Sequence, residues 1–415
     1  MPTVGIRPQN GGCYRSRHVG GRAGDRMSLP AAAGGTPAFP EGLAFVRPTV
    51  PDLEQVVARF APSYERGMLT NGPVVRAFEE QAAEYLGVPH VVAVSSCTAG
   101  LMLVIRILAP KGPVVLPSFT FSASAHAIAW NGLEPRFVEC DPASFQVDTD
   151  SVADRLAGAG AVLATHVFGS PCDVETLERM AGAAGIPVLF DAAHAFGARR
   201  DGRAVGGFGA AEVFSLSPTK VVVAGEGGVV ATHDSSLAEA LRIGRDYGNP
   251  GDYDTRFVGL NARMSELHAA IAIESLRGLD DRLVIRRRIV DRYRSGLAEL
   301  PGVVAQHVDA RDESTYKDFT VAIDEAAFGL SRDLVVKALR ADGIDTRNYF
   351  SPPVHRQQAY RDVEPFDLPV TDRAAGQVVS LPIYTTITDA QVDAVAQVLA
   401  ALHQHADEVR AALHA

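Results

Sequence analysis

The sequence predicts an α/β protein with a mainly parallel sheet and a second, smaller domain near its C-terminus. Short apolar runs alternate with helical segments from Glu41 onward, which is typical of parallel strands joined by helices. After Pro301 the strands become sparse, which marks a change of architecture. The length of 415 residues, with 47% hydrophobic and 21% charged side chains, allows two or three domains with ordinary cores.

The first 40 residues differ from the rest of the chain. They contain eight Gly, five Pro, five Arg and one acidic residue, with no apolar periodicity. Such a segment buries too little apolar surface to offset its ordering entropy, so we expect residues 1–40 to be disordered. An Arg-rich organellar presequence is an alternative. We prefer a third explanation, in which translation starts at Met27 and the preceding stretch is a mis-assigned extension.

The large sheet is predicted from short, buried apolar runs separated by helix-like stretches. The expected strands are 91–94, 114–116, 136–139, 161–165, 187–190 and 213–216, with 227–232 as a strand running the other way. The expected helices between them are 99–108, 122–130, 151–156 and 174–184. Strands and helices in this order favour right-handed crossovers, so the carboxyl ends of the strands are where a ligand would bind.

The C-terminal third is predicted to contain more helix than strand. Long helices are expected at 265–276 and 282–297, followed by a strand at 319–323 and helices at 332–341 and 389–403. We therefore divide the chain into a disordered extension (1–40), a large ligand-binding domain (41–290) and a small domain (291–415).

Charge and cysteine content exclude several classes of protein. The net charge of −10 leaves no broad basic surface for nucleic acid. The four cysteines lie far apart without a C-x-x-C pair, which favours free thiols in the cytoplasm over disulfides or a zinc site. The longest apolar stretch, 114–130, is interrupted by Pro, Ser and His residues and is too polar to span a membrane.

One segment with potential chemistry is the transition from strand to helix at residues 95–99, Ser-Ser-Cys-Thr-Ala. The first amides of a helix have no intrahelical acceptor, so this turn can bind an anion. The alternative is an ordinary N-cap by Ser96 or Thr98. Cys97 is a weak candidate for a nucleophile, because no base is tied to it by spacing.

A second segment is Asp191-Ala-Ala-His194. An aspartate at the end of an apolar strand is costly unless it meets a cation. His194 would lie one helical turn further on, on the same side. The two side chains alone are too few ligands for a metal ion, so we expect no metal site. The alternative is a helix cap beside a hydrogen-bonded histidine.

A third segment is Ser215-Leu-Ser-Pro-Thr-Lys220, followed by an apolar run. Lysine is rarely buried without a partner, and a desolvated lysine can form a Schiff base with a carbonyl. A surface lysine is the alternative. Taken together, an anion-binding helix start, an aspartate and a lysine are the parts that pyridoxal 5'-phosphate (PLP) needs.

With these residues the chain resembles the fold-type I PLP enzymes, and within them the DegT/StrS-type nucleotide-sugar aminotransferases. The resemblance extends from about Leu69 to near the C-terminus. It rests on six motifs in order: Ser96-Cys-Thr-Ala, Pro117-Ser-Phe-Thr-Phe-Ser-Ala-Ser, Asp191-Ala-Ala-His, Ser215-Leu-Ser-Pro-Thr-Lys220, Gly225-Glu-Gly-Gly and Asn261-Ala-Arg-Met-Ser-Glu. It implies a fold-type I PLP-transferase, with a mainly parallel sheet of the seven-stranded type in the large domain and a smaller C-terminal α+β domain.

The resemblance also implies a role for each matching residue. Lys220 is the Schiff-base lysine and proton shuttle, and Asp191 is the partner of the pyridine nitrogen. The remaining assignments are His194 near the ring hydroxyl, Phe121 stacked on the ring, Cys97, Thr98 and Ser215 on the phosphate, and Asn261 on the phosphate of a neighbouring subunit. The implied assembly is therefore a homodimer. Cys97 stands where glycine is common, and His268 where glutamine is common. The glycines 225–228 either contact the cofactor or only support the following strand.

The implied activity is transfer of an amino group from an amino acid, glutamate in the family's usual pattern, to a keto sugar nucleotide. The stretches Ala129-Trp-Asn-Gly-Leu-Glu-Pro and Tyr316-Lys-Asp-Phe most resemble members that aminate 4-keto-6-deoxy sugars. The alternatives are a keto-cyclitol or other ketone as acceptor, and a non-catalytic regulator with this fold. Lys220 argues against relatives that dehydrate their substrate and carry histidine there. Tyr316, Lys317, Arg347 and His355 are hypothetical substrate contacts.

Overall fold

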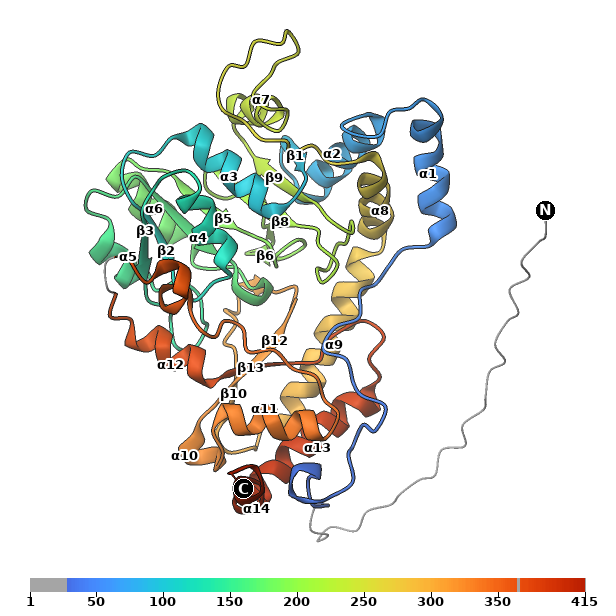
Figure 1. Ribbon diagram of the computed structural model, residues 1–415, viewed down its shortest axis with the longest axis vertical. Helices are drawn as coiled ribbons and strands as arrows, with labels where there is room; N and C mark the ends of the chain where they lie inside the picture. The colour runs from blue at the N-terminus through green and yellow to red at the C-terminus, as the bar shows by residue number, and fades with distance from the viewer. Residues whose placement is uncertain (1–27, 364–365, 415) are drawn as a thin grey trace, which may run out of the picture.

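The computed structural model describes residues 28–363 and 366–414. Its main feature is a seven-stranded sheet in the order β1-β9-β8-β5-β4-β2-β3 (Figure 1). The strands are β1 (His90–Val94), β2 (Val114–Pro117), β3 (Pro135–Val138), β4 (Ala161–Thr165), β5 (Val188–Asp191), β8 (Ala211–Ser215) and β9 (Gly228–Thr232). Only β9 runs antiparallel to its neighbours in this sheet, as predicted. The expected fold class, a mainly parallel sheet of a fold-type I transferase, is confirmed.

Alternate residues of the strands enter two different hydrophobic clusters, so both faces of the large sheet are covered. Val91 and Ala93 of β1 belong to one cluster, whereas Val92 and Val94 belong to the other. The first cluster includes side chains of α2 (Pro73–Leu86), α5 (Thr149–Arg155), α6 (Val174–Ala184) and α8 (Glu266–Arg277). The second includes side chains of α3 (Cys97–Leu108), α4 (Ser122–Ala129) and α7 (Ser235–Gly244). Burial on both faces explains why these strands are continuous apolar runs.

A second sheet of three antiparallel strands, β10-β12-β13, lies in the C-terminal part. Its strands are β10 (Val303–Ala305), β12 (Phe319–Ile323) and β13 (Val378–Leu381), and the helices are α10 (Glu325–Phe328), α11 (Arg332–Ala341), α12 (Pro369–Gln377), α13 (Asp389–Gln404) and α14 (Ala406–His414). The helix α9 (Leu279–Leu297) extends between the regions of the two sheets (Figure 1). The predicted boundary at residues 290 and 291 lies inside α9, and the division into domains stays a prediction.

A third, small sheet links the two parts of the chain. It contains β6 (Arg199–Arg200), β7 (Arg203–Ala204) and β11 (Asp312–Glu313), in the order β11-β6-β7. Asp312 pairs with Arg200 across it. Because β11 lies just before β12, this pairing anchors the segment that enters the small sheet.

The expectation of disorder was wrong for residues 28–40. A short 3-10 helix, η1, forms at Ala31–Ala33, and the backbone amides of Ala31 and Ala38 donate hydrogen bonds to the carboxylate of Asp342 at 3.2 and 3.1 Å. Phe39 packs against the small-sheet core. The carboxylate satisfies backbone donors that the segment cannot satisfy internally, which composition alone does not reveal. Residues 1–27, and with them both hypotheses about Met27 and a presequence, lie outside the described residues.

Candidate functional site

The carboxyl ends of three strands in the large sheet converge on one cavity. β1, β5 and β8 end at Val94, Asp191 and Ser215, and the cavity next to them has a volume of about 280 Å³. Seven of the eight predicted site residues line it: Cys97, Thr98, Phe121, Asp191, His194, Ser215 and Lys220. The topology therefore brings together segments that are more than a hundred residues apart in sequence.

The N-terminus of α3 forms one wall of this cavity. Ser96 is the N-cap, and its hydroxyl accepts a hydrogen bond from the amide of Ala99 at 3.1 Å. The amides of Cys97 and Thr98 open the helix and have no intrahelical acceptor, so they are available to an anion. Gly228 approaches this turn so closely that a Cβ atom there would lie 2.6 Å from the amide nitrogen of Cys97. Glycine at this position thus has a packing role beside the helix start.

Asp191 is buried at the end of β5, with 4% of its surface exposed. The Ser124 hydroxyl donates to Oδ2 at 2.6 Å, and the amide of Ala193 donates to Oδ1 at 3.0 Å. These two donors fix the orientation of the carboxylate. The residues after Asp191 form turns rather than a helix, so the alternative of a helix cap is wrong.

Lys220 lies in a turn just beyond β8, where its amide donates to the carbonyl of Ser217 at 3.0 Å. Burial, followed by repulsion from Lys317, lowers the pKa of Lys220 from 10.5 to about 8. A substantial fraction of the amine is therefore neutral near pH 7.5, as a nucleophile or base requires. The alternative of a surface lysine is wrong.

His194 lies in the turn after Asp191, and its ring is stacked near Phe350 at a centroid distance of 6.5 Å. The Nδ1 atom is buried and has no hydrogen-bond partner within the described chain. Burial, then the charges of Lys220 and Lys317, hold the pKa of His194 well below 6.5. The imidazole is therefore neutral, with a ring nitrogen left for a ligand.

Phe121 and Cys97 present two different surfaces to the cavity. Phe121 is 59% exposed although it is a large apolar side chain, so its ring is open to a planar ligand. Cys97 is buried, and burial, then the charge of Asp191, raises the pKa of its thiol well above 9.0. A protonated thiol is a poor nucleophile, so the idea of a nucleophilic Cys97 is not supported.

Asn261 is exposed and does not line the cavity of its own chain. The N-cap of α8 is Ser265, whose hydroxyl accepts from the amide of His268 at 3.1 Å. Asn261 therefore does not cap that helix. Its predicted role in a neighbouring subunit stays a prediction.

Of the four hypothetical substrate contacts, only Lys317 lines the cavity. Arg347 is paired with Asp345 at 2.7 Å. His355 lies 2.6 Å from the Ser118 hydroxyl. Tyr316 holds its ring beneath the guanidinium of Arg294. Tyr349 and Phe350 also line the cavity and were not predicted from the sequence. Neither was Ser124, whose hydroxyl donates to Asp191.

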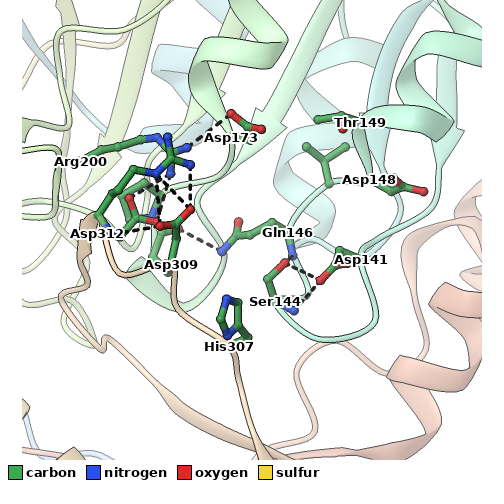
Figure 2. Close-up of a pocket in the computed structure, with 14 residues that line it drawn as sticks. Asp141, Ser144, Gln146, Asp148, Thr149, Asp173, Arg200, His307, Asp309 and Asp312 are labelled. Atoms are coloured by element: carbon green, nitrogen blue, oxygen red, sulfur yellow. Dashed lines mark hydrogen bonds and ion pairs between the residues drawn. The ribbon is translucent and has the colours of Figure 1, made fainter.

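A second cavity, of about 260 Å³, lies beside the third sheet (Figure 2). Its lining includes Arg200, whose side chain is 2% exposed and paired with Asp173, Glu175 and Asp312 at 3.4, 2.7 and 3.0 Å. All three guanidinium nitrogens are engaged in these pairs, so we interpret this cluster as a structural link between α6, β6 and β11.

Within residues 28–363 and 366–414, no group of three or more His, Cys, Asp or Glu side chains is arranged to hold a metal ion. No helix in the same ranges is long and apolar enough to cross a membrane.

Comparisons with known proteins agree with this geometry. The family model of the DegT/DnrJ/EryC1/StrS aminotransferase family matches residues 52–400. The chain is 30% identical over 351 residues to dTDP-4-amino-4,6-dideoxy-D-glucose transaminase of Escherichia coli, covering 83% of this chain and 94% of that protein. It is 32% identical over 339 residues to GDP-perosamine synthase of Caulobacter vibrioides, covering 80% and 90%. The crystal structure of DesI in the presence of its TDP-sugar product superposes with a TM-score of 0.88 at 38% identity, covering 93% and 99%.

Proposed function

Because this chain belongs to the DegT/DnrJ/EryC1/StrS aminotransferase family, we propose that it is a PLP-dependent enzyme that aminates a keto sugar nucleotide. The proposed acceptor is a dTDP-4-keto-6-deoxyhexose and the proposed donor is L-glutamate. Relatives named as a dTDP-sugar transaminase, a perosamine synthase and DesI support this substrate class.

The observation that carries the proposal is the single cavity that contains a lysine, a buried aspartate and a helix N-terminus. Three features fit PLP. The unpartnered Nδ1 of His194 offers a hydrogen-bonding atom to a polar ring substituent. The open ring of Phe121 offers a stacking surface. The amides of Cys97 and Thr98 offer donors to a phosphate.

In this arrangement the chain would hold PLP at three points. The α3 amides and the Ser215 hydroxyl would bind the phosphate. Phe121 would stack on the ring, and Asp191 would pair with the pyridine nitrogen. When bound, PLP supplies an electron sink for charge that develops on the amino donor. Asp191 sustains this effect because Ser124 and the Ala193 amide hold its carboxylate in one orientation.

Lys220 would perform the proton transfers. Because the pKa of Lys220 is lowered to about 8, both the protonated and the neutral amine are populated near neutral pH. This is the condition for efficient general acid–base catalysis. The neutral His194 beside it adds no competing positive charge.

The proposal includes a homodimer and a cytoplasmic location. Exposed apolar side chains near α1 (Leu53–Glu65) and in the segment before Asn261 support an interface between subunits: Val57, Tyr64, Met68, Leu69, Tyr253 and Val258. The widely spaced cysteines support a reducing compartment.

The test is a panel of keto-sugar nucleotides incubated with the protein, PLP and L-glutamate, with mass spectrometry of the products. We expect one 4-keto-6-deoxy sugar nucleotide to lose its keto oxygen and gain an amino group. The control is the Lys220→Ala variant. A protein that aminates only keto-cyclitols, or that binds PLP without turning over any donor, would contradict the proposal.

A further inference from the structure

Lysine is rare in this chain, and its placement is uneven. Only four of the 39 basic residues are lysines, at positions 111, 220, 317 and 337. Two of these four, Lys220 and Lys317, line the same cavity, whereas Lys111 and Lys337 are exposed. Because nearly all the other basic residues are arginines, two lysine ammonium groups in one cavity indicate a specific need for lysine there.

Lys317 is held in the cavity wall by a buried ion pair. Its surface is 5% exposed, and its Nζ atom lies 2.8 Å from Oδ1 of Asp318. The same Nζ lies 5.5 Å from the ring centroid of Tyr349. Lys317 lines the cavity and Asp318 does not. The pair therefore presents its positive end to the cavity.

The backbone around Lys317 is also fixed. The buried guanidinium of Arg286, on α9, donates to the carbonyls of Tyr316 and Lys317 at 2.7 Å. Tyr316 has a φ of 45°, in the left-handed region that is costly for residues other than glycine. Strained backbone of this kind is concentrated at functional sites, where the surrounding structure maintains it. A surface lysine would need no such support.

We propose that Lys317 is a positioning residue for the reaction, whose fixed ammonium repels a proton from the amine of Lys220 and so keeps that amine ready to act. This inference rests on the proposed function. Repulsion from Lys317 follows burial as a cause of the lowered pKa of Lys220, and it lowers that of His194 in the same way. The charges of Asp318 and Asp191 act on Lys220 in the opposite direction.

The titratable side chains that line the cavity around Lys220 are Cys97, Asp191, His194, Glu226, Lys317 and Tyr349. Lys317 is the one lysine or arginine among these six. Removing it should therefore change the protonation of Lys220 in one direction only, towards the charged amine.

The experiment measures this protonation directly and without substrate. The full-length chain, freed of cofactor, is treated with acetic anhydride at pH values from about 6 to 11, a range that brackets lowered and ordinary lysine pKa values. Only neutral amines are acetylated, with acetate as the leaving group. Mass spectrometry of peptides then gives the extent of reaction at each lysine, and Lys111 and Lys337 serve as internal references.

For the unmodified sequence we expect Lys220 to titrate near pH 8. Lys317→Met should raise this midpoint by about one pH unit, the scale of one nearby charge in a partly buried site. At pH 7 the acetylation of Lys220 would then slow by roughly tenfold. Lys317→Arg, which keeps the charge, should restore most of the original midpoint. Lys337→Met is the matched control and should leave it unchanged.

An unchanged Lys220 midpoint in a folded Lys317→Met protein would overturn the proposal, and a raised KM for glutamate alongside it would assign Lys317 to donor binding. Should circular dichroism show that Lys317→Met does not fold, Lys317→Gln removes the charge of Lys317 with a polar side chain and leaves Asp318 in place. We expect its midpoint to rise as well, and an unchanged or lower midpoint would likewise overturn the proposal. Because no substrate is used, failure of the keto-sugar panel does not alter this result.

Discussion

Some side chains of the cavity could be predicted from their local sequence, and others could not. Asp191 ends an apolar strand and Lys220 lies in the turn beyond another, and burial of a charge at such positions is unusual and therefore informative. Ser124 was missed because a serine in the first turn of a helix is ordinary, and its bond to Asp191 joins segments 67 positions apart. Tyr349 and Phe350 were missed because they lie in an irregular segment without periodicity.

Replacing Lys220 tests the proposed chemistry most directly. Lys220→Ala should reduce multiple-turnover transamination by at least the roughly 10²–10⁴-fold of a lost acid–base group. Cofactor and aminated product should still bind together, because the proposed contacts of the phosphate, the ring and Asp191 do not involve Lys220. Steady-state rates and a binding titration provide the measurement, with Lys337→Ala as the control. Substantial turnover by Lys220→Ala would contradict the assignment.

Replacing Asp191 should slow the reaction more than replacing Ser124, whose hydroxyl orients the Asp191 carboxylate. Asp191→Asn removes the proposed ionic partner of the pyridine nitrogen, so we expect the half-reaction with glutamate to slow by more than about 10²-fold. Ser124→Ala leaves the carboxylate in place and removes one hydrogen bond to a charged group, so its loss should be smaller. Stopped-flow absorbance of the bound cofactor measures both rates. Equal rates for Asp191→Asn and the unmodified sequence would leave the aspartate with a structural role only.

At the scale of helices and strands, burial explains what the sequence could predict. The strands of the large sheet are covered on both faces and appear as apolar runs, and β4 was predicted with its observed bounds. β12 of the small sheet was also predicted with its observed bounds. β6, β7 and β11 have two residues each, too few for any periodicity. β13 and α14 were also missed, because their apolar residues meet partners that are distant in sequence.

The segment at 28–40 should contribute to stability through Asp342. A chain that begins at residue 41 loses two hydrogen bonds to that carboxylate, at about 1 kcal/mol each. We expect its Tm to be several degrees lower than that of a chain that begins at residue 28, as measured by calorimetry. Equal Tm values for the two truncations would show that the segment contributes nothing.

The Arg200 cluster should make stability depend on pH with a definite sign. Burial raises the pKa of Asp312 from 3.8 to about 6. Between these values the folded chain keeps a proton that the unfolded chain releases, so this group's contribution to stability falls as pH rises. The difference in urea midpoint between the unmodified sequence and Asp312→Asn should therefore decrease from pH 4 to 6 and then level off.

Asp309 is the matched control for this measurement. Hydrogen bonding to Arg311 holds the pKa of Asp309 well below its usual range. Its contribution is present above the unfolded pKa and is lost only as pH falls below that value. The difference between the unmodified sequence and Asp309→Asn should therefore stay flat above about pH 5. A flat Asp312→Asn difference would contradict the prediction for Asp312.

At the scale of the whole molecule, the proposed homodimer predicts that each active site needs residues from two chains. If Asn261 serves the partner's phosphate, each active site combines Lys220 of one chain with Asn261 of the other, and a two-fold interface contains both copies equally. Mixing Lys220→Ala with an inactive, bulky Asn261→Trp variant should restore about half of the sites in each heterodimer. Activity is measured after co-refolding or subunit exchange. Inactive heterodimers would indicate that Asn261 acts within its own chain and not in the site of the partner.

The anchoring of residues 28–40 on the small-sheet side also determines where the two ends of the described chain emerge. η1 contacts α14, and both lie beyond the small sheet, on the side away from the large sheet (Figure 1). A fusion partner joined directly at Ser28 and one joined after α14 would therefore attach at neighbouring points. Immobilised through either end, the protein would present the large sheet outward, and a short linker between the ends would suffice to build a circular permutant.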